Sequence, residues 1–408
     1  MTTSSVTPRV LISAGEVSGD IVGAALITAL RKAEPASEID AVGGPRMAKA
    51  GARLITSANH LGAVGVSEGL AMVPSALCVL RQVKRHVRVA RPDVAVLIAN
   101  DIFNHVLARW LRRQGIATVA LFPPQAWVWR PLLRRFARPL DLVLASFRHE
   151  EQCYREAGAK TVFVGHYLAD MLSPVSAADR AAARQALGLP SAGPVVAILP
   201  GSRAHEVARL LPVLLGAIDV LHRRLPGMHA VAALTPAAKS AGSPMLGTAG
   251  GGSVLTTTDS HAAMRAADVV LCCSGTATLE AALLGAPHVV VYRMSRTTFC
   301  VVRLCIRLGL LSSDTIGLPN LVTGRAIVPE LKQGHATAEM VAAVAATLIT
   351  DGEPRQAMCA ALSEVRREVT RSDTLTRAAT LVLEHGRAHR PAGEAHRMIP
   401  ADSRSGRA

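Results

Sequence analysis

Two short loops carry the residue types best suited to binding a phosphorylated ligand. The first is Ser13-Ala14-Gly15-Glu16-Val17-Ser18-Gly19-Asp20, which follows an apolar run and precedes a helical pattern over 21–30. Its glycines let the backbone turn sharply, and the free N–H groups at the start of the helix favour an anion. The second is Ser274-Gly275-Thr276-Ala277-Thr278-Leu279-Glu280, in a similar setting. Many α/β proteins have one such loop, so two in one chain predict two nucleotide-fold halves with a cleft between them.

Alternating strand-like and helical runs must position these loops. The predicted strands are short, nearly continuous runs of Val, Ile and Leu, which is typical of buried parallel strands. They cover 10–13, 39–42, 94–98, 118–122, 142–145 and 161–164, then 195–199, 230–234, 269–271 and 288–292. Helical patterns lie between them, for instance over 177–187, 206–224 and 278–284. This alternation predicts parallel sheets with helices on both faces, whose ligands bind at the carboxyl ends of the strands.

Composition restricts the class of protein and its partners. The chain has 408 residues, half of them hydrophobic, which is enough for two domains. Its net charge of +15 predicts an anionic membrane or a phosphorylated substrate as partner, unless a GC-rich genome alone explains the arginines. Because no nucleic-acid-binding signature appears, nucleic acid is not expected. Seven cysteines without a CxxC pairing, no signal-peptide pattern and no long apolar run predict a cytoplasmic protein.

Eight motifs, in order and at about the right spacing, resemble those of the lipid A disaccharide synthase family. This is a family of membrane-associated glycosyltransferases of Gram-negative bacteria, and the resemblance covers roughly residues 8–385. The motifs are Ala14-Gly15-Glu16-Val17-Ser18-Gly19-Asp20, Gly43-Gly44-Pro45-Arg46-Met47, Trp127-Val128-Trp129-Arg130, Phe163-Val164-Gly165-His166, Leu199-Pro200-Gly201-Ser202-Arg203, the Ser274–Glu280 loop, Val291-Tyr292-Arg293-Met294 and Leu318-Pro319-Asn320-Leu321.

The resemblance implies an α/β fold of the GT-B type, with two Rossmann-like domains and a cleft between them. We expect an acceptor- and membrane-binding domain over 1–172 and a UDP-sugar-binding domain over 173–355. A helical segment over 356–385 is expected to pack back on the first domain, and 386–408 to form a disordered basic tail.

The family's reaction joins UDP-2,3-diacylglucosamine to 2,3-diacylglucosamine 1-phosphate, which yields a β-1,6-linked disaccharide phosphate and UDP. The implied enzyme is an inverting hexosyltransferase that needs no metal and no cofactor. Its substrates place it on the inner leaflet of the cytoplasmic membrane, as a peripheral protein. A homodimer stays open.

The resemblance also assigns binding residues. The backbone N–H groups of Ser274, Gly275 and Thr276 would meet the diphosphate at a helix N-terminus, and Arg203 would pair with it in two-pronged fashion. Glu280 would bind the ribose hydroxyls. The remaining expected binding residues are Gly15, Ser18, Gly19 and Asn320, although Asn320 has the alternative of capping the next helix. His166 and His261 fit structural roles better than catalytic ones.

The chain departs from the family at the position of the presumed catalytic aspartate. The family has Ile-Asp-Ala-Pro-Asp-Phe-Asn where this chain reads Ile98-Ala99-Asn100-Asp101-Ile102-Phe103-Asn104. Alanine cannot take the proton of the acceptor hydroxyl. Three readings stay open: Asp101 replaces the missing carboxylate, Glu16 or Asp20 serves, or the protein binds UDP-sugar with little or no catalysis. Asp101 has the alternative role of capping the next helix.

The expected membrane face combines apolar and basic residues. Over 70–91, Met72, Val73, Leu77, Leu80 and Val83 lie beside Arg81, Lys84, Arg85 and Arg88. Such a helix either lies in the headgroup region or packs on the core with a solvated basic side. Further basic clusters are Arg109, Arg112 and Arg113, and Arg130, Arg134, Arg135 and Arg138. The stretch 299–308 is expected to bind acyl chains or a second subunit.

Two other functions are compatible with the same residues. One is a UDP-sugar transferase with a different acceptor. The other is a non-catalytic protein that binds UDP-sugar or lipid.

Overall fold

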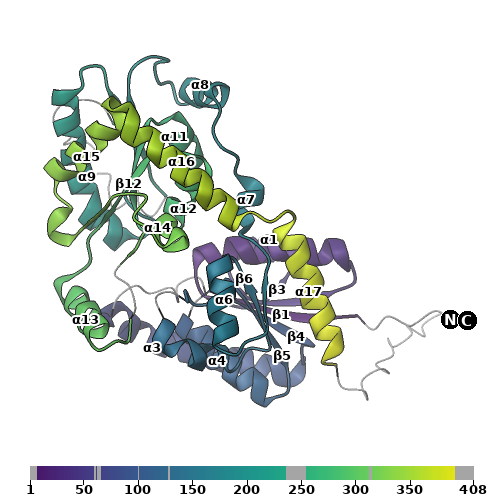
Figure 1. The fold of residues 1–408 in the computed structure, drawn as a ribbon. Coiled ribbons are helices and arrows are strands. Elements are labelled where there is room, and N and C mark those ends of the chain that lie inside the picture. The colour runs from purple at the N-terminus through teal and green to yellow at the C-terminus, as the bar shows by residue number, and fades with distance from the viewer. Residues whose placement is uncertain are drawn as a thin grey trace, which may run out of the picture.

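The chain forms two parallel sheets, one above the other in Figure 1. The computed structural model describes residues 7–58, 61, 66–99, 101–126, 129–235, 254–311 and 315–390, without the side chains of 66–71, 101 and 296. The first sheet has seven strands in the order β3-β2-β1-β4-β5-β6-β7. These strands are β1 (Arg9–Ala14), β2 (Glu38–Gly43), β3 (Arg53–Ser57), β4 (Val94–Ile98), β5 (Ala117–Leu121), β6 (Leu142–Ala145) and β7 (Thr161–Phe163).

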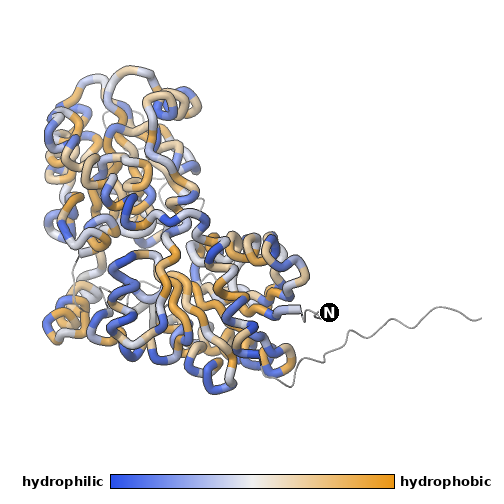
Figure 2. Tube along the Cα trace, turned by 45° about the vertical axis from the view of Figure 1, so that its right-hand side comes forward, coloured by the Kyte–Doolittle hydropathy of each residue, from blue (hydrophilic) through white to orange (hydrophobic). Residues whose placement is uncertain are grey.

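The second sheet repeats the arrangement with six strands in the order β10-β9-β8-β11-β12-β13. They are β8 (Val195–Leu199), β9 (His229–Ala233), β10 (Val254–Thr257), β11 (Val269–Cys273), β12 (His288–Tyr292) and β13 (Glu330–Lys332). Every residue of the central strands β4, β8 and β11 is buried. Figure 2 shows the strands of the first sheet as an apolar layer inside the lower half.

Helices connect the parallel strands. Those of the first half are α1 (Val17–Ala33), α2 (Pro45–Lys49), α3 (Val66–Val89), α4 (Asp101–Arg113), the short η1 (Arg130–Leu132), α5 (Leu133–Ala137), α6 (Arg148–Glu156) and α7 (Tyr167–Met171). The second half has α8 (Ala177–Ala186), α9 (Ala204–Arg224), α11 (Ser260–Ala266), α12 (Thr276–Leu283), α13 (Arg296–Arg307), α14 (Leu318–Thr323), η2 (Gln333–His335) and α15 (Ala338–Thr350). Two C-terminal helices follow, α16 (Gly352–Val369) and α17 (Thr374–Ala388).

The structure confirms the α/β fold with two Rossmann-like halves, and contains all ten predicted strands. The sequence missed the edge strands β3, β10 and β13. None of their residues is buried, so they lack the continuous apolar run that marks a central strand.

The two C-terminal helices divide between the halves. Within the segment predicted over 356–385, α16 packs against α12, α14 and α15, whereas α17 packs against α1 and β4. Of the two, α17 therefore packs on the sheet of the first half, as was expected of the whole segment. Residues 370–373 join the two helices, and Gly165, with a φ of +89°, lies against them, since a Cβ there would be 2.8 Å from that of Arg371. Helix α17 continues to Ala388, past the start of the predicted tail at 386, and residues 391–408 lie outside the described part.

Among the described helices, none is long and apolar enough to cross a membrane. The described residues also contain no cluster of three or more His, Cys, Asp or Glu that could hold a metal ion.

Candidate active site

Topology alone marks one edge of each sheet as the ligand site. In the first sheet β1 lies between β2 and β4, and in the second β8 lies between β9 and β11. The chain order reverses at these strands, and open parallel sheets bind ligands at the carboxyl ends of the strands at such a switch point. Both loops singled out in the sequence follow switch-point strands, since one leaves β1 and the other leaves β11.

The loop after β1 brings α1 close to the sheet. Gly15 is buried, Glu16 is the extended N-cap residue of α1, and Ser18 lies in the first turn. A Cβ on Gly19 would lie 2.9 Å from the Cβ of Ala14. A glycine is therefore required here for close packing of the helix on the strand.

Asp20 is used inside the protein. Its side chain is buried, and its carboxylate accepts backbone N–H groups from Gly44 at 2.9 Å, Met47 at 3.1 Å and Arg46 at 3.2 Å. These groups lie at the start of α2, so Asp20 fastens α2 to the glycine loop and satisfies N–H groups that a helix leaves unpaired.

Ala99, at the position of the family's aspartate, ends β4 in an unusual conformation. Its φ is +47°, in the left-handed region that non-glycine residues rarely adopt. The amide of Asn104 holds it there, since Nδ2 donates to the carbonyls of Ala99 at 2.6 Å and Ile98 at 3.0 Å. Asn104 Oδ1 accepts from the hydroxyl of Ser13 at 2.8 Å, which ties the ends of β1 and β4 together.

Asp101 is the first residue of α4, at the same edge of the sheet as Glu16. Its side chain lies outside the described residues. The motif residues Trp127 and Val128 also lie outside them.

Arg203 spans the two halves. It is the N-cap residue of α9, after β8, and its guanidinium lies 2.9 Å from the Glu206 carboxylate and 3.5 Å from that of Glu16. Glu206 is buried and also accepts the backbone N–H groups of Ser202 and Arg203, both at 3.2 Å. Buried Glu206 thus orients Arg203, while the side chains of Arg203 and Glu16 keep 33% and 27% exposure.

The loop after β11 offers free backbone at the start of a helix. Gly275 is exposed with a φ of +140° and precedes α12, which begins at Thr276. Ser274 donates its hydroxyl to the carbonyl of Ile316 at 2.7 Å, and Thr278 donates to the carbonyl of Gly275 at 2.8 Å. Side chains therefore fix the loop, and within the described part of the chain no side chain caps the N-terminus of α12.

Glu280, one turn into α12, pairs with His261, for which the sequence predicted a structural role. Its carboxylate lies 2.9 Å from Nε2 of His261, and this hydrogen bond raises the pKa of the imidazole. Burial raises the pKa of Tyr167, and the nearby charge of Glu280 raises it further. Glu280 is therefore close to α7 of the first half as well as to α11.

His166 has a structural environment. It is buried among the rings of Phe122, Phe147 and Tyr167, and its Nδ1 accepts the backbone N–H of Leu168 at 3.3 Å. Burial lowers its pKa to about 3, so the imidazole is neutral at physiological pH.

Asn320 is neither a helix cap nor free for a ligand. It lies within α14, whose N-cap residue is Gly317. Its amide donates to the carbonyl of Val328 at 2.8 Å and to Glu330 at 2.9 Å, and it accepts N–H groups from Ile327 and Val328. All of its hydrogen-bonding capacity is used within the protein.

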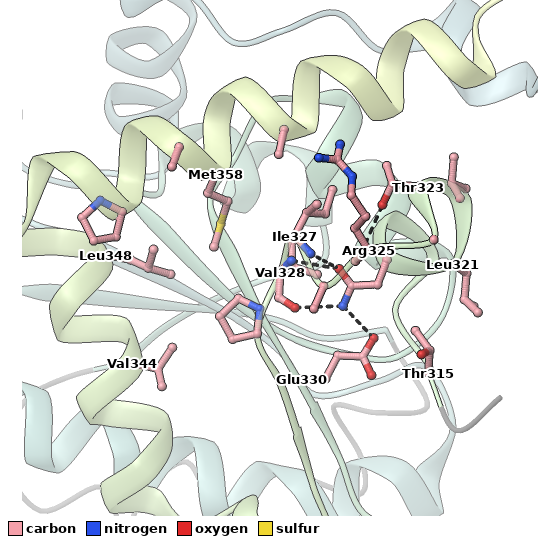
Figure 3. Close-up of a pocket in the computed structure, with 18 of the residues that line it drawn as sticks. Thr315, Leu321, Thr323, Arg325, Ile327, Val328, Glu330, Val344, Leu348 and Met358 are labelled. Atoms are coloured by element: carbon pink, nitrogen blue, oxygen red, sulfur yellow. Dashed lines mark hydrogen bonds between the residues drawn. The ribbon is translucent and has the colours of Figure 1, made fainter.

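These bonds hold one wall of a cavity of about 1040 Å³ in the second half (Figure 3). The cavity lies between α14, α15 and α16, and its apolar lining includes Leu321, Ile327, Val344, Leu348 and Met358. None of Glu16, Arg203, Ser274 and Glu280 lines it, so it is separate from the switch-point loops.

The structure brings Glu16 and Arg203 together. Sequence reasoning missed Glu206, and it named His261 without its contact to Glu280. The spacing of Arg203 and Glu206, three residues apart at a helix start, could have indicated the first contact. No local signal indicates the second.

Two halves with loops meeting at their switch points define the class of the protein as GT-B type. Solved structures agree on this fold. A putative UDP-N-acetylglucosamine 2-epimerase from Listeria monocytogenes has a TM-score of 0.61 at 13% identity, covering 94% of this chain and 98% of that one. The glycotransferase of kitacinnamycin has a TM-score of 0.60 at 16% identity, covering 93% and 100%.

Sequence comparison is more specific than the fold. The family model for lipid-A-disaccharide synthetase matches residues 10–383. The lipid-A-disaccharide synthase of Myxococcus xanthus is 36% identical over 92% of this chain and 97% of its own length. That of Pseudomonas aeruginosa strain UCBPP-PA14 is 38% identical over the same shares. The chain belongs to the lipid-A-disaccharide synthetase family and is a hexosyltransferase of lipid A biosynthesis.

Proposed function

We propose that this protein transfers a 2,3-diacylglucosamine unit from UDP to 2,3-diacylglucosamine 1-phosphate, with inversion at the anomeric carbon. The observation that carries the proposal is the contact between Arg203 of the second half and Glu16 of the first, at the switch points of both sheets, in a chain of this family. Such a site holds a donor on one half and an acceptor on the other.

The second half holds the donor. The transfer leaves charge on UDP, and preoriented donors lower the barrier most where charge develops. The backbone N–H groups of Ser274, Gly275 and Thr276 and the guanidinium of Arg203 bind the diphosphate, and Glu280 binds the ribose. Arg203 is suited to this role because Glu206 already orients it without burying it. Glu16 contacts one nitrogen of the guanidinium, Nη2.

The first half supplies the base, and two carboxylates are available for it. Asp20 is bound by three backbone N–H groups, which favours a role in positioning the Gly15–Gly19 loop that lines the substrate site. Asp101 lies at the start of α4 beside the end of β4 and is our first choice. Glu16 is the second choice, because its carboxylate already pairs with the guanidinium of Arg203.

Ala99 and Ile102, which replace two aspartates of the family, are compatible with a different acceptor. Ile102 takes the position of the family's second aspartate and is 72% exposed at the start of α4. An apolar residue there favours an acceptor with a less polar group near the reacting hydroxyl.

Acylated substrates require contact with a bilayer, and two helices offer it. On α13, Val301, Leu304 and Leu308 are exposed and spaced three and four residues apart, which places them on one face. On α3, Val73 and Leu77 are exposed and precede a basic end, whereas Leu80 and Val83 face the core. Figure 1 draws α13 below the second sheet, at the level of α3. We propose that α3 and α13 both contact the inner leaflet.

Direct turnover tests the proposal. Purified protein in detergent micelles receives UDP-2,3-diacylglucosamine and 2,3-diacylglucosamine 1-phosphate, and disaccharide phosphate and UDP are followed together. Equimolar appearance of both supports the synthase. Bound UDP-sugar without either product overturns it in favour of a different acceptor or a binding protein, and transfer to other hydroxyl acceptors separates those two.

A further inference from the structure

His261 and Glu280 meet although they come from separate helices. His261 is the second residue of α11, and Glu280 lies in the middle of α12. Their contact of 2.9 Å joins Nε2 to Oε2, with side chains 32% and 18% exposed. Asp259 is the N-cap residue of α11 and accepts the N–H of Ala262 at 2.9 Å. This hydrogen bond fixes the first turn of the helix, which carries His261.

Only one direction is possible for the hydrogen bond between His261 and Glu280. An ionised carboxylate only accepts hydrogen bonds, so Nε2 must carry the proton and donate it. This occupies Oε2 and fixes the plane of the carboxylate. The other oxygen, Oε1, makes no further hydrogen bond among the described residues.

A glutamate side chain has three rotatable bonds, and holding it in one orientation in advance reduces the entropy lost on binding a ligand. We propose that His261 is a positioning residue for the donor site: it holds the Glu280 carboxylate so that its free oxygen accepts the ribose hydroxyls of UDP. The inference rests on the ribose-binding role of Glu280 proposed above. It assigns to His261 no contact with the reacting atoms.

Two further charged groups act on His261. Asp259, the N-cap residue of α11, raises the pKa of the imidazole, and Arg265 of α11 lowers it. Tyr167 of α7 lies near Glu280. Removing the imidazole therefore leaves the Glu280 carboxylate without the hydrogen bond that fixes its orientation. We expect the carboxylate to lose its fixed orientation, which should weaken its hydrogen bonds to the ribose hydroxyls.

The test compares UDP with 2′-deoxy-UDP by calorimetry on the full chain. The variants are His261→Ala, His261→Gln, which keeps an N–H donor, and Glu280→Gln. The control is His335→Gln, at an exposed histidine of the same half. We expect the wild type and control to bind UDP about 10-fold more tightly than 2′-deoxy-UDP, the range of one hydrogen bond to a charged group.

His261→Ala should reduce this preference to about 2-fold, mainly by weakening UDP, and His261→Gln should restore most of it. An unchanged preference in His261→Ala, with Glu280→Gln losing it, overturns the positioning role alone. A preference that survives in Glu280→Gln overturns the ribose role of Glu280. Equal melting temperatures of His261→Ala and wild type exclude a folding defect as the cause.

Discussion

The two switch points of the molecule differ in where their polar side chains are used. Beside β1 and β4, Asp20 binds the N-terminus of α2 and Asn104 binds the carbonyls that end β4, so both face inward. Beside β8 and β11, Arg203 and Glu280 stay partly exposed, and Glu206 orients the first while His261 contacts the second.

We call the first half the shaped half, because its polar side chains fix loops, and the second the charged half, because its charged side chains stay partly exposed. In the first half Asp20 and Asn104 fix loops, and we propose Asp101 or Glu16 as the base. In the second half, buried Glu206 and half-buried His261 hold the charged side chains for which we propose contacts to a diphosphate and a ribose. Substitutions in the first half should therefore affect turnover or stability, and those in the second half should affect UDP binding.

The largest effect should come from Asp101→Ala. Loss of a general base slows transfer by about 10²- to 10⁴-fold, with UDP affinity unchanged because the donor half is intact. Initial rates of disaccharide formation and calorimetry with UDP measure the two quantities, and Glu16→Gln is the matched variant. Full activity in Asp101→Ala with inactivity in Glu16→Gln would transfer the role of base to Glu16.

Acid should destabilise both halves together. Burial lowers the pKa of His166 to about 3 and that of His288 to about 4. In the unfolded chain these groups take up protons below pH ~6.5, so stability is full above that pH and falls as pH drops toward 4. Each contributes about 1.4 kcal/mol per pH unit. Urea unfolding between pH 6.5 and 4.5 measures the slope. A flat profile would contradict the prediction, and exposed His335→Gln should leave the slope unchanged.

Arg203→Ala tests the charged half. Hydrogen bonds to charged groups contribute about 1.5–3 kcal/mol, so the affinity for UDP should fall about 10- to 100-fold. Arg203→Lys should recover part of it, because lysine keeps the charge without the planar fork. The control is exposed Arg224→Ala at the far end of α9. Retained affinity in Arg203→Ala would remove Arg203 from the diphosphate site.

Gly19→Ala tests the shaped half. The added Cβ would lie 2.9 Å from that of Ala14, so α1 must move from β1. Overpacking of this kind costs about 1–3 kcal/mol, measured as a lower urea midpoint. Gly352→Ala, where a Cβ meets nothing within 4 Å, is the control. Equal midpoints would mean that the helix adjusts at no cost.

The smallest effect should come from the membrane face. Replacing Leu304 and Leu308 with Ser should weaken binding to anionic vesicles several-fold, because each apolar side chain contributes about 1.5–3 kcal/mol when fully buried and less at an interface. Flotation with vesicles measures it. Val89→Ser is the control, since Val89 is 85% exposed at the other end of α3. Equal losses in both variants would rule out a specific role for α13.

The sequence by itself determined the sheets and the loops that carry the site. Continuous apolar runs mark central strands because both faces are buried, and glycines mark the turns after β1 and β11. The edge strand β13 was not predicted, because none of its residues is buried and it lacks a continuous apolar run.

Only the tertiary structure decided which polar residues bind backbone groups inside the protein and which stay partly exposed. Asp20 and Asn320 satisfy backbone groups of segments up to 27 residues away, whereas Arg203 meets Glu16 over 187 residues and His261 meets Glu280 over 19. Such pairings depend on how α2, α9, α11 and α12 sit on the sheets. A local pattern records that a side chain is polar, but its partner is chosen by packing.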